Sequence, residues 1–294
     1  MKTLTPHKCL AIATLSFALV ACGGGGGGGS SGSVTVTPFT SWGAIQPNST
    51  VQATGTSIQA SGGGFAAGDG TFTGTYNSSP VLTAFTVSTS TGSSATFNKN
   101  GTDTFAYSGD LILAKNAANT SVAVLVDPVV DGWNYQSYGV WVNSSPATVA
   151  AVSIGSLTAV ANIPTSGTGA FTGGAGGIFY NSGNTTAYAF GSNMNANVNF
   201  ATRSIAFSTT NSWQQNISTG VTTTNVTALN LSGTLGYFAG TNSFTGTLAS
   251  NGTYGLSGTA TGKFYGPTAN ELGGTFGLNT SSATYMIGGF GGKR

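Results

Sequence analysis

The sequence predicts an all-β protein, built as one large unit or two smaller ones. From Val34 onward, segments rich in Thr, Val, Phe and Tyr are separated by clusters of Gly, Asn and Ser about every 8 to 15 residues, a spacing typical of short antiparallel strands. Apolar and polar residues alternate with period two inside these segments, most clearly between Thr253 and Phe264. A helical period is almost absent, so we expect strands to form the core.

Residues 1–21 have the pattern of an export signal. Lys2 and Lys8 precede an apolar run that ends at Ala21, and this run is shorter than the ~20 residues of a membrane-spanning helix. Leu19-Val20-Ala21-Cys22 resembles the lipobox of bacterial lipoproteins, which implies that Cys22 becomes the lipidated first residue of the mature chain. The alternative is an ordinary secretory signal in which Cys22 is incidental.

A flexible tether follows the expected lipidation site. Residues 22–33 consist of Cys22 followed only by Gly and Ser, a composition that behaves as a random coil. Glycine rather than aspartate at position 23 agrees with sorting to the outer membrane. We therefore expect a folded body that begins at Val34 and is held close to a membrane by its lipid.

Charge and cysteine content exclude several classes of function. Cys9 and His7 leave with the signal, so the mature chain has no disulfide and no imidazole. Eight Lys and Arg face six Asp and Glu, and two of the eight lie in the signal, which leaves the mature chain formally neutral. A neutral surface lacks the positive field that holds phosphate backbones, so nucleic-acid binding is not expected.

No catalytic or metal-ligand set is evident in the mature chain. A Ser or Thr nucleophile would have no His or Cys partner, and transition-metal ligands are missing for the same reason. We therefore predict no enzyme activity, no metal and no cofactor, although haem recognition through Tyr, Met or a haem-carrying protein stays open. Asp127 and Asp131 could form a carboxylate pair for glycoside cleavage, but their position beside Pro128 favours hydrogen bonds within a turn.

A short motif of an apolar residue, a hydroxyl residue, Gly and a hydroxyl residue recurs along the chain. It occurs at Phe72–Thr75, Leu231–Thr234, Phe244–Thr247 and Leu256–Thr259, with a partial copy at Phe171–Gly173. Glycine on the apolar face of a strand makes room for a bulky neighbour and lets the strand bend, as closed barrels require. We expect the apolar face to point inward, into a packed barrel interior.

The most specific segment of the chain spans residues 262–274. A strand is expected to end at Phe264 and Tyr265, a turn to follow at Gly266-Pro267, one helical turn to span Thr268–Leu272 and a new strand to start after Gly273-Gly274. Glu271, the only glutamate of the chain, is expected to accept backbone hydrogen bonds within this turn.

This segment resembles the barrel signature of transferrin-binding protein B and related surface lipoproteins, Gly-x-Phe-Tyr-Gly-Pro-x-Ala-x-Glu-x-Gly-Gly. The residues that match it are Gly262, Phe264, Tyr265, Gly266, Pro267, Ala269, Glu271, Gly273 and Gly274. Residues 286–294 resemble the closing strand of the same family. The resemblance implies an N-terminal β-rich handle domain, residues 34–145, followed by a C-terminal eight-stranded antiparallel β-barrel, residues 146–294.

The aromatic stretch Trp133–Trp141 is similar to the end of the family's handle, and it is either an aromatic core strand or a binding surface. The resemblance implies a non-enzymatic outer-membrane lipoprotein at the cell surface that binds a host or environmental protein, with a transferrin-like or haem-carrying protein as the first ligand class to test. It also implies an outer-membrane translocator for surface lipoproteins as a partner. The alternative is a structural or adhesive surface lipoprotein without a role in iron acquisition.

Overall fold

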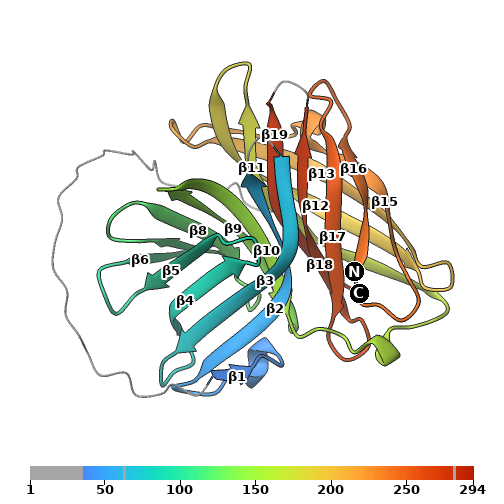
Figure 1. Cartoon of the computed structure of the whole chain (residues 1–294), viewed down its shortest axis with the longest axis horizontal. Coiled ribbons are helices and arrows are strands. Elements are labelled where there is room, and N and C mark those ends of the chain that lie inside the picture. Colours follow the sequence, from blue (N-terminus) through green and yellow to red (C-terminus); the bar gives the residue numbers. More distant parts are fainter. Residues whose placement is uncertain (1–35, 62–63, 281–282) are drawn as a thin grey trace.

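The computed structural model describes residues 36–61, 64–280 and 283–294. The predicted signal peptide, Cys22 and the tether lie outside the described residues. In the described ranges almost all regular structure is β-strand, arranged as two sheets that follow one another along the chain (Figure 1). No helix within these ranges is long and apolar enough to cross a membrane.

The first sheet has ten strands in the order β5-β4-β3-β2-β10-β9-β8-β7-β6, with β1 paired to β2 in parallel and all other neighbours antiparallel. Its elements are β1 (Val36–Pro38), the 3-10 turn η1 (Trp42–Ala44), β2 (Thr50–Ser61), β3 (Gly64–Tyr76), β4 (Leu82–Thr89), β5 (Ser94–Asn98), β6 (Thr104–Ser108), β7 (Leu111–Lys115), β8 (Ser121–Val126), β9 (Gln136–Ser144) and β10 (Ala147–Gly155).

The two edges of this sheet are β5 and β6, which are consecutive in the chain, so the sheet curls until it is nearly closed. Asp103 lies in the loop between them. Its carboxylate accepts hydrogen bonds from the Asn98 N–H at 2.7 Å and from the Ala117 N–H at 2.9 Å. This side chain therefore holds the end of β5 next to the turn between β7 and β8.

Aromatic side chains fill the concave side of the first sheet. Phe72, Phe85 and Phe97 pack in succession, with ring centroids 5.9 and 5.0 Å apart. Trp141 is fully buried and its indole N–H donates to the Ser93 hydroxyl at 3.1 Å. Trp133 is buried as well, so both tryptophans of the aromatic stretch are part of the protein interior, while Ser137 and Tyr138 of the same stretch line a pocket described below.

The second sheet closes on itself as an eight-stranded antiparallel barrel, as predicted, because β12 also pairs with β13. Its elements are β11 (Thr168–Asn181), β12 (Thr186–Asn199), β13 (Ser204–Asn216), the two-residue β14 (Thr222–Thr223), the 3-10 turn η3 (Thr227–Leu229), β15 (Leu231–Tyr237), β16 (Phe244–Ser250), β17 (Ser257–Tyr265), β18 (Glu271–Asn279) and β19 (Tyr285–Lys293). A 3-10 turn, η2 (Val160–Asn162), lies in the connection between the two sheets.

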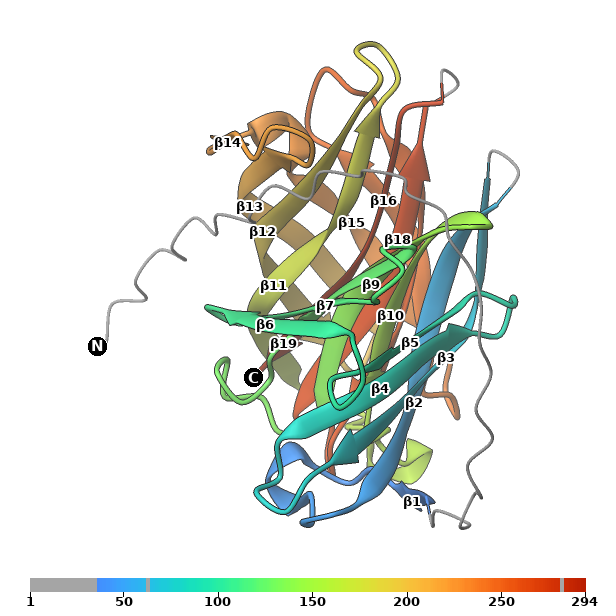
Figure 2. The ribbon, with the colours of Figure 1, turned by 90° about the vertical axis from the view of Figure 1, so that its left-hand side faces the viewer.

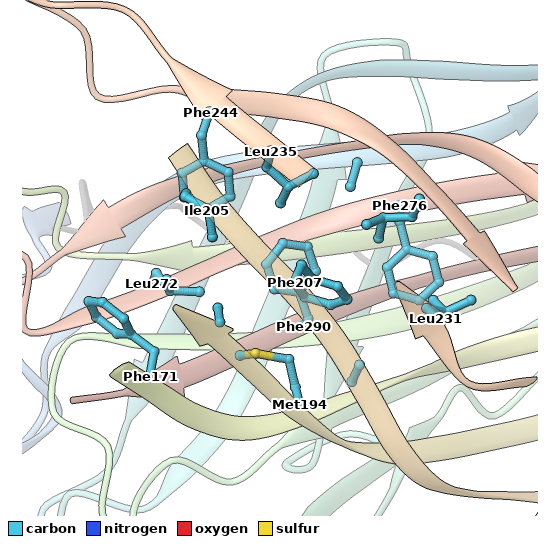
Figure 3. Close-up of a cluster of buried hydrophobic side chains, with 14 of the residues drawn as sticks. Phe171, Met194, Ile205, Phe207, Leu231, Leu235, Phe244, Leu272, Phe276 and Phe290 are labelled. Carbon is cyan, nitrogen blue, oxygen red and sulfur yellow. The ribbon is translucent and has the colours of Figure 1, made fainter. Parts of the chain in front are cut away.

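The apolar face of the barrel strands points inward and fills the barrel. Figure 3 shows Phe207, Phe276 and Phe290 meeting near the axis with side chains from the surrounding strands. The recurring glycines of the barrel strands lie on this inner face, whereas Gly74 lies on β3 of the first sheet. A Cβ at Gly246 would come within 3.0 Å of Leu235, and one at Gly233 within 2.9 Å of Leu248. The glycines therefore make the space that the larger side chains occupy, as the motif predicted.

The first sheet continues beyond the predicted domain boundary at residues 145 and 146. Ser144 pairs with Ala147 across the β9–β10 turn, and β10 then pairs with β2 as far as Gly155. The change of sheet lies in the connection of residues 156–167. The alternating Val and Ala of β10 do not distinguish a handle strand from a barrel strand, which explains the difference.

Candidate functional site

The signature segment forms the end of β17, a tight turn and the start of β18. The expected helical turn over Thr268–Leu272 is absent. Gly266 and Ala269 have φ values of 85° and 56°, and these left-handed conformations interrupt a right-handed helix. The second strand consequently starts at Glu271, earlier than predicted.

One group of signature residues points into the barrel. Phe264 is fully buried, with its ring centroid 5.3 Å from that of Tyr237 and 5.4 Å from that of Phe244. Gly262 lies against the Phe244 ring, where a Cβ would collide with it. Ala269 is also part of the buried barrel cluster. These residues specify how the barrel interior packs at the end of β17.

A second group points out of the barrel, toward the first sheet. Tyr265 is fully buried, and its hydroxyl lies 3.1 Å from the Ser153 hydroxyl of β10. Burial raises the pKa of this tyrosine, and the hydrogen bond to Ser153 opposes the rise. Gly55 and Gly155 leave the space for the tyrosine, because a Cβ on Gly55 would come within 2.6 Å of the hydroxyl and one on Gly155 within 2.8 Å of the ring.

Glu271 binds the first sheet rather than its own turn, which corrects the sequence-based expectation. Its carboxylate accepts three backbone hydrogen bonds, from the N–H groups of Asn134 at 2.7 Å and of Tyr135 and Gln136 at 2.9 Å. Burial raises the pKa of this carboxyl, although these three bonds and the charge of Lys293 oppose the rise. The proton of Glu271 is therefore held to higher pH in the folded than in the unfolded chain.

Glycines on the outer face of β18 and β19 provide the rest of the contact. Gly273 and Gly291 are directly opposite one another, and Gln136 of β9 packs on both. A Cβ on Gly273 would lie 2.7 Å from the Gln136 Oε1 and 2.6 Å from the Ser153 Oγ. Figure 1 shows the first sheet meeting the barrel at β2 and β10, beside β18 and β19. The two glycines of the signature pair therefore lie on opposite faces of β18. Gly274 faces the barrel core and Gly273 faces the first domain.

The signature residues therefore form a structural junction between the two domains. Tyr265, Glu271 and Gly273 all contact residues of β9, β10 or the segment just before β9. Each of these contacts is buried or backbone-directed, and none presents a side chain to an external ligand. The signature thus determines how the domains are joined.

No group of three or more His, Cys, Asp or Glu side chains is positioned in the described ranges to hold a metal ion. Asp127 Oδ1 accepts the Val129 N–H at 3.0 Å, and the Asp131 N–H contacts the Asp127 carbonyl at 3.3 Å. Asp127 therefore makes the turn hydrogen bonds expected beside Pro128.

An apolar pocket of about 260 Å³ opens at the end of the first sheet that is formed by η1, the β3–β4 turn and the loop after β8. Its inner wall consists of the side chains of Phe72, Tyr76, Leu82, Ile112, Leu125 and Ile154. Val81, Tyr107 and Val129 line its mouth and are 40%, 48% and 73% exposed, and Val130, next to Val129, is 60% exposed. Exposed apolar groups around a concave site mark binding surfaces more often than isolated ones do.

Apart from Asp127 and from Ser137 and Tyr138 of the aromatic stretch, no pocket residue was considered for a functional role from the sequence. The pocket residues come from η1, from the seven strands β3, β4, β6, β7, β8, β9 and β10, and from the loops after β3 and β8, which meet only because the first sheet curls. The one local signal is the pair Val129-Val130 in a loop that otherwise carries Pro, Asp and Gly. These two adjacent β-branched apolar residues lie outside any strand. The sequence around them shows no alternation of apolar and polar residues that would assign them to a buried face.

Comparison with known proteins identifies the barrel. Residues 163–294 match the family described as the C-lobe and N-lobe beta barrels of Tf-binding protein B. No curated protein matches the chain significantly.

Comparison with solved structures finds similarity to three binding proteins, among others. They are a mutant transferrin-binding protein B from Haemophilus parasuis Hp5 (16% identity over 76% of this chain and 51% of that one, TM-score 0.48), isotype 1 transferrin-binding protein B from serogroup B Neisseria meningitidis (14%, 76% and 50%, 0.44) and the N-lobe of lactoferrin-binding protein B from Moraxella bovis (12%, 63% and 79%, 0.34). The chain spans about half the length of the first two. The family match covers the barrel, residues 163–294, which is therefore similar to the beta barrels of Tf-binding protein B.

Proposed function

We propose that this protein is a non-enzymatic surface lipoprotein that binds a host or environmental protein, with an iron or haem carrier such as a transferrin-like protein as the first class to test. The observation that carries the proposal is the apolar pocket of the first domain and its exposed rim of Val81, Tyr107, Val129 and Val130. Apolar residues at these exposures are costly in water unless a partner covers them. A uniformly polar surface would have favoured the structural alternative.

The geometry favours a protein ligand over a free cofactor. The barrel interior is filled by buried side chains such as Phe276 and Phe290 and offers no room for a ligand. The pocket of about 260 Å³ is smaller than the roughly 300–1,000 Å³ of sites for drug-sized ligands and cofactors. It can take one or two side chains of a partner. On this proposal the protein binds the iron- or haem-carrying protein and does not bind the iron or haem directly.

One observation supports the adhesive alternative. A hollow of about 540 Å³ also borders Tyr76 and is lined mainly by amide and hydroxyl side chains, those of Asn48, Thr50, Thr75, Asn77, Thr83 and Asn100. Such groups can donate and accept hydrogen bonds to sugar hydroxyls. Binding of soluble glycans in place of proteins, unaffected by changes at the apolar rim, would favour this second function.

The binding function is tested by capture from host serum and from mixtures of haem proteins on the mature chain immobilised through its N-terminus. We expect retention of an iron or haem carrier. Val129→Asp should weaken that retention about tenfold or more, because a carboxylate at a central apolar contact must be desolvated on binding. Val221→Asp is the matched control, since Val221 is 64% exposed on a loop of the barrel. If no protein is retained from any mixture, or if the two variants weaken retention equally, the structural alternative is favoured.

Anchoring through Cys22 is part of the same proposal, together with sorting to the outer membrane and export by a surface-lipoprotein translocator. The lipobox-like sequence and the Gly/Ser run after it support this step. Cys22→Ser removes the acceptor of the lipid, so the variant should move from the membrane fraction to the soluble fraction. Retention of this variant in the membrane fraction would contradict a lipid anchor. Surface exposure is tested separately: if protease added to intact cells does not cleave the wild-type protein, the protein is not exposed at the cell surface.

A further inference from the structure

The pocket of the first domain also carries information about the chemistry of its ligand. Its floor is mostly apolar, and Tyr76 is one of the polar side chains that line it. Tyr76 is only 7% exposed, it lines the pocket, and its hydroxyl is not among the fully buried polar atoms that lack a partner, so it is accessible from the pocket. A tyrosine hydroxyl can both donate and accept a hydrogen bond. The pocket therefore offers a hydrogen bond to whatever fills it.

The charge at the pocket is negative. Asp127 is the only charged residue that lines it. One carboxylate oxygen, Oδ1, accepts the Val129 N–H, and no described residue hydrogen-bonds to the other oxygen. Lys99 lies over the ring of Tyr107 at 5.8 Å from its centroid, and it makes no ion pair with Asp127 in the described part of the chain. A carboxylate at the edge of an apolar pocket is best satisfied by a cation that arrives with the ligand.

The tether of this chain does not supply such a ligand. Residues 23–33 are all Gly or Ser, so they contain neither an apolar side chain for the pocket nor a cation for Asp127. The occupant must therefore combine an apolar group, small enough for about 260 Å³, with a positive charge a few ångströms from it.

We propose that this pocket takes an aliphatic or aromatic side chain of the protein partner that is flanked by a Lys or Arg, which pairs with Asp127 at the pocket mouth. The inference rests on the proposed function and specifies the partner's contact surface: a segment in which one apolar residue and one basic residue are adjacent. The apolar side chain packs between Tyr107 and Val129, and the Tyr76 hydroxyl bonds the polar atoms nearest to it. An acidic flanking residue is disfavoured by Asp127.

The test uses the mature chain and three synthetic peptides of equal length that share a Gly/Ser frame and contain Phe-Lys, Phe-Glu or Ser-Lys at the centre. Binding is followed by two-dimensional NMR and by the fluorescence of Trp42, which lines the pocket. We expect the Phe-Lys peptide to bind about three- to tenfold more tightly than the Phe-Glu peptide. The Ser-Lys peptide, which lacks the apolar group, should be the weakest of the three.

Two isosteric variants identify the group responsible. Asp127→Asn keeps the Oδ1 acceptor for the Val129 N–H and should abolish the preference for Phe-Lys over Phe-Glu. Asp110→Asn makes the same change of charge on a neighbouring residue, whose carbonyl accepts the Asp127 N–H at 2.7 Å but which does not line the pocket, so the preference should be retained.

Two outcomes would overturn the inference: no binding of any peptide, or a preference that survives Asp127→Asn. Capture of a carrier protein that depends on Val129 would leave the proposed function standing in either case. Failure of the inference is therefore distinguishable from failure of the function.

Discussion

Replacing Glu271 by alanine is expected to lower the free energy of unfolding by about 3–5 kcal/mol, because three backbone N–H groups then lose a charged acceptor at a buried junction. Glu271 is 2% exposed, and its three donors, Asn134 to Gln136, immediately precede or begin β9. Urea denaturation followed by tryptophan fluorescence measures the change, since Trp133 and Trp141 flank this segment and are buried.

Asp103→Ala is the matched control for this loss. Asp103 also accepts two backbone hydrogen bonds, from Asn98 and Ala117, but it lies in a loop at the edge of one domain. Water can replace the missing acceptor there, so we expect a loss of about 1 kcal/mol. Equal losses for Asp103→Ala and Glu271→Ala would contradict a special role of Glu271 at the junction.

The pH dependence of Glu271→Gln provides a second measurement with a defined sign. The folded-state pKa of Glu271 is raised above its ordinary value of 4.5, so the native state binds more protons than the unfolded state between these two pKa values. The stabilisation that comes from the raised pKa of Glu271 is present below pH 4.5 and is lost as pH rises through the raised pKa, while the three backbone hydrogen bonds to the carboxylate remain. The stability difference between the wild type and Glu271→Gln should therefore shrink as pH rises across this interval.

Local patterns predicted the type of fold because they record which face of each strand is buried. The alternation in Gly258, Ala260, Gly262 and Phe264 corresponds to the inward face of β17, and the Gly-containing repeats mark where neighbouring side chains need space. The eight-stranded barrel followed from the family resemblance of residues 262–274, not from periodicity alone. Period two specifies faces and leaves the number and order of strands open.

Contacts between distant segments could not be predicted in the same way. Glu271 had a plausible local role, but its three donors are more than 130 residues away in sequence. The pocket of Tyr76, Tyr107 and Asp127 likewise depends on the curl of the first sheet. A single sequence shows that a Glu or a Val is unusual at its position, and only the fold shows what lies opposite to it.

Gly273→Val is expected to destabilise the protein by about 2–4 kcal/mol, because a side chain on this face of β18 has no space. Its Cβ alone would lie 2.6 Å from the Ser153 Oγ, 2.7 Å from the Gln136 Oε1 and 3.0 Å from the backbone carbonyl of Phe290. Gln136 and Ser153 are fully buried, so they cannot swing into solvent to relieve the overlap. Denaturation gives the size of the loss, and amide hydrogen exchange in β9 and β10 locates it.

Gly236→Val separates this effect from the general consequence of placing valine in a barrel strand. Gly236 lies on β15, and the nearest atom to a Cβ there would be the Arg203 carbonyl at 3.5 Å, an ordinary contact. Valine has a higher strand propensity than glycine, so this variant should be neutral or slightly stabilised. If Gly273→Val were equally neutral, the contact between the domains at this glycine would contribute little to the free energy of unfolding. The signature glycine would then matter only for the packing of the barrel. A selective loss of protection in β9 and β10 would instead show that the signature holds the two domains together.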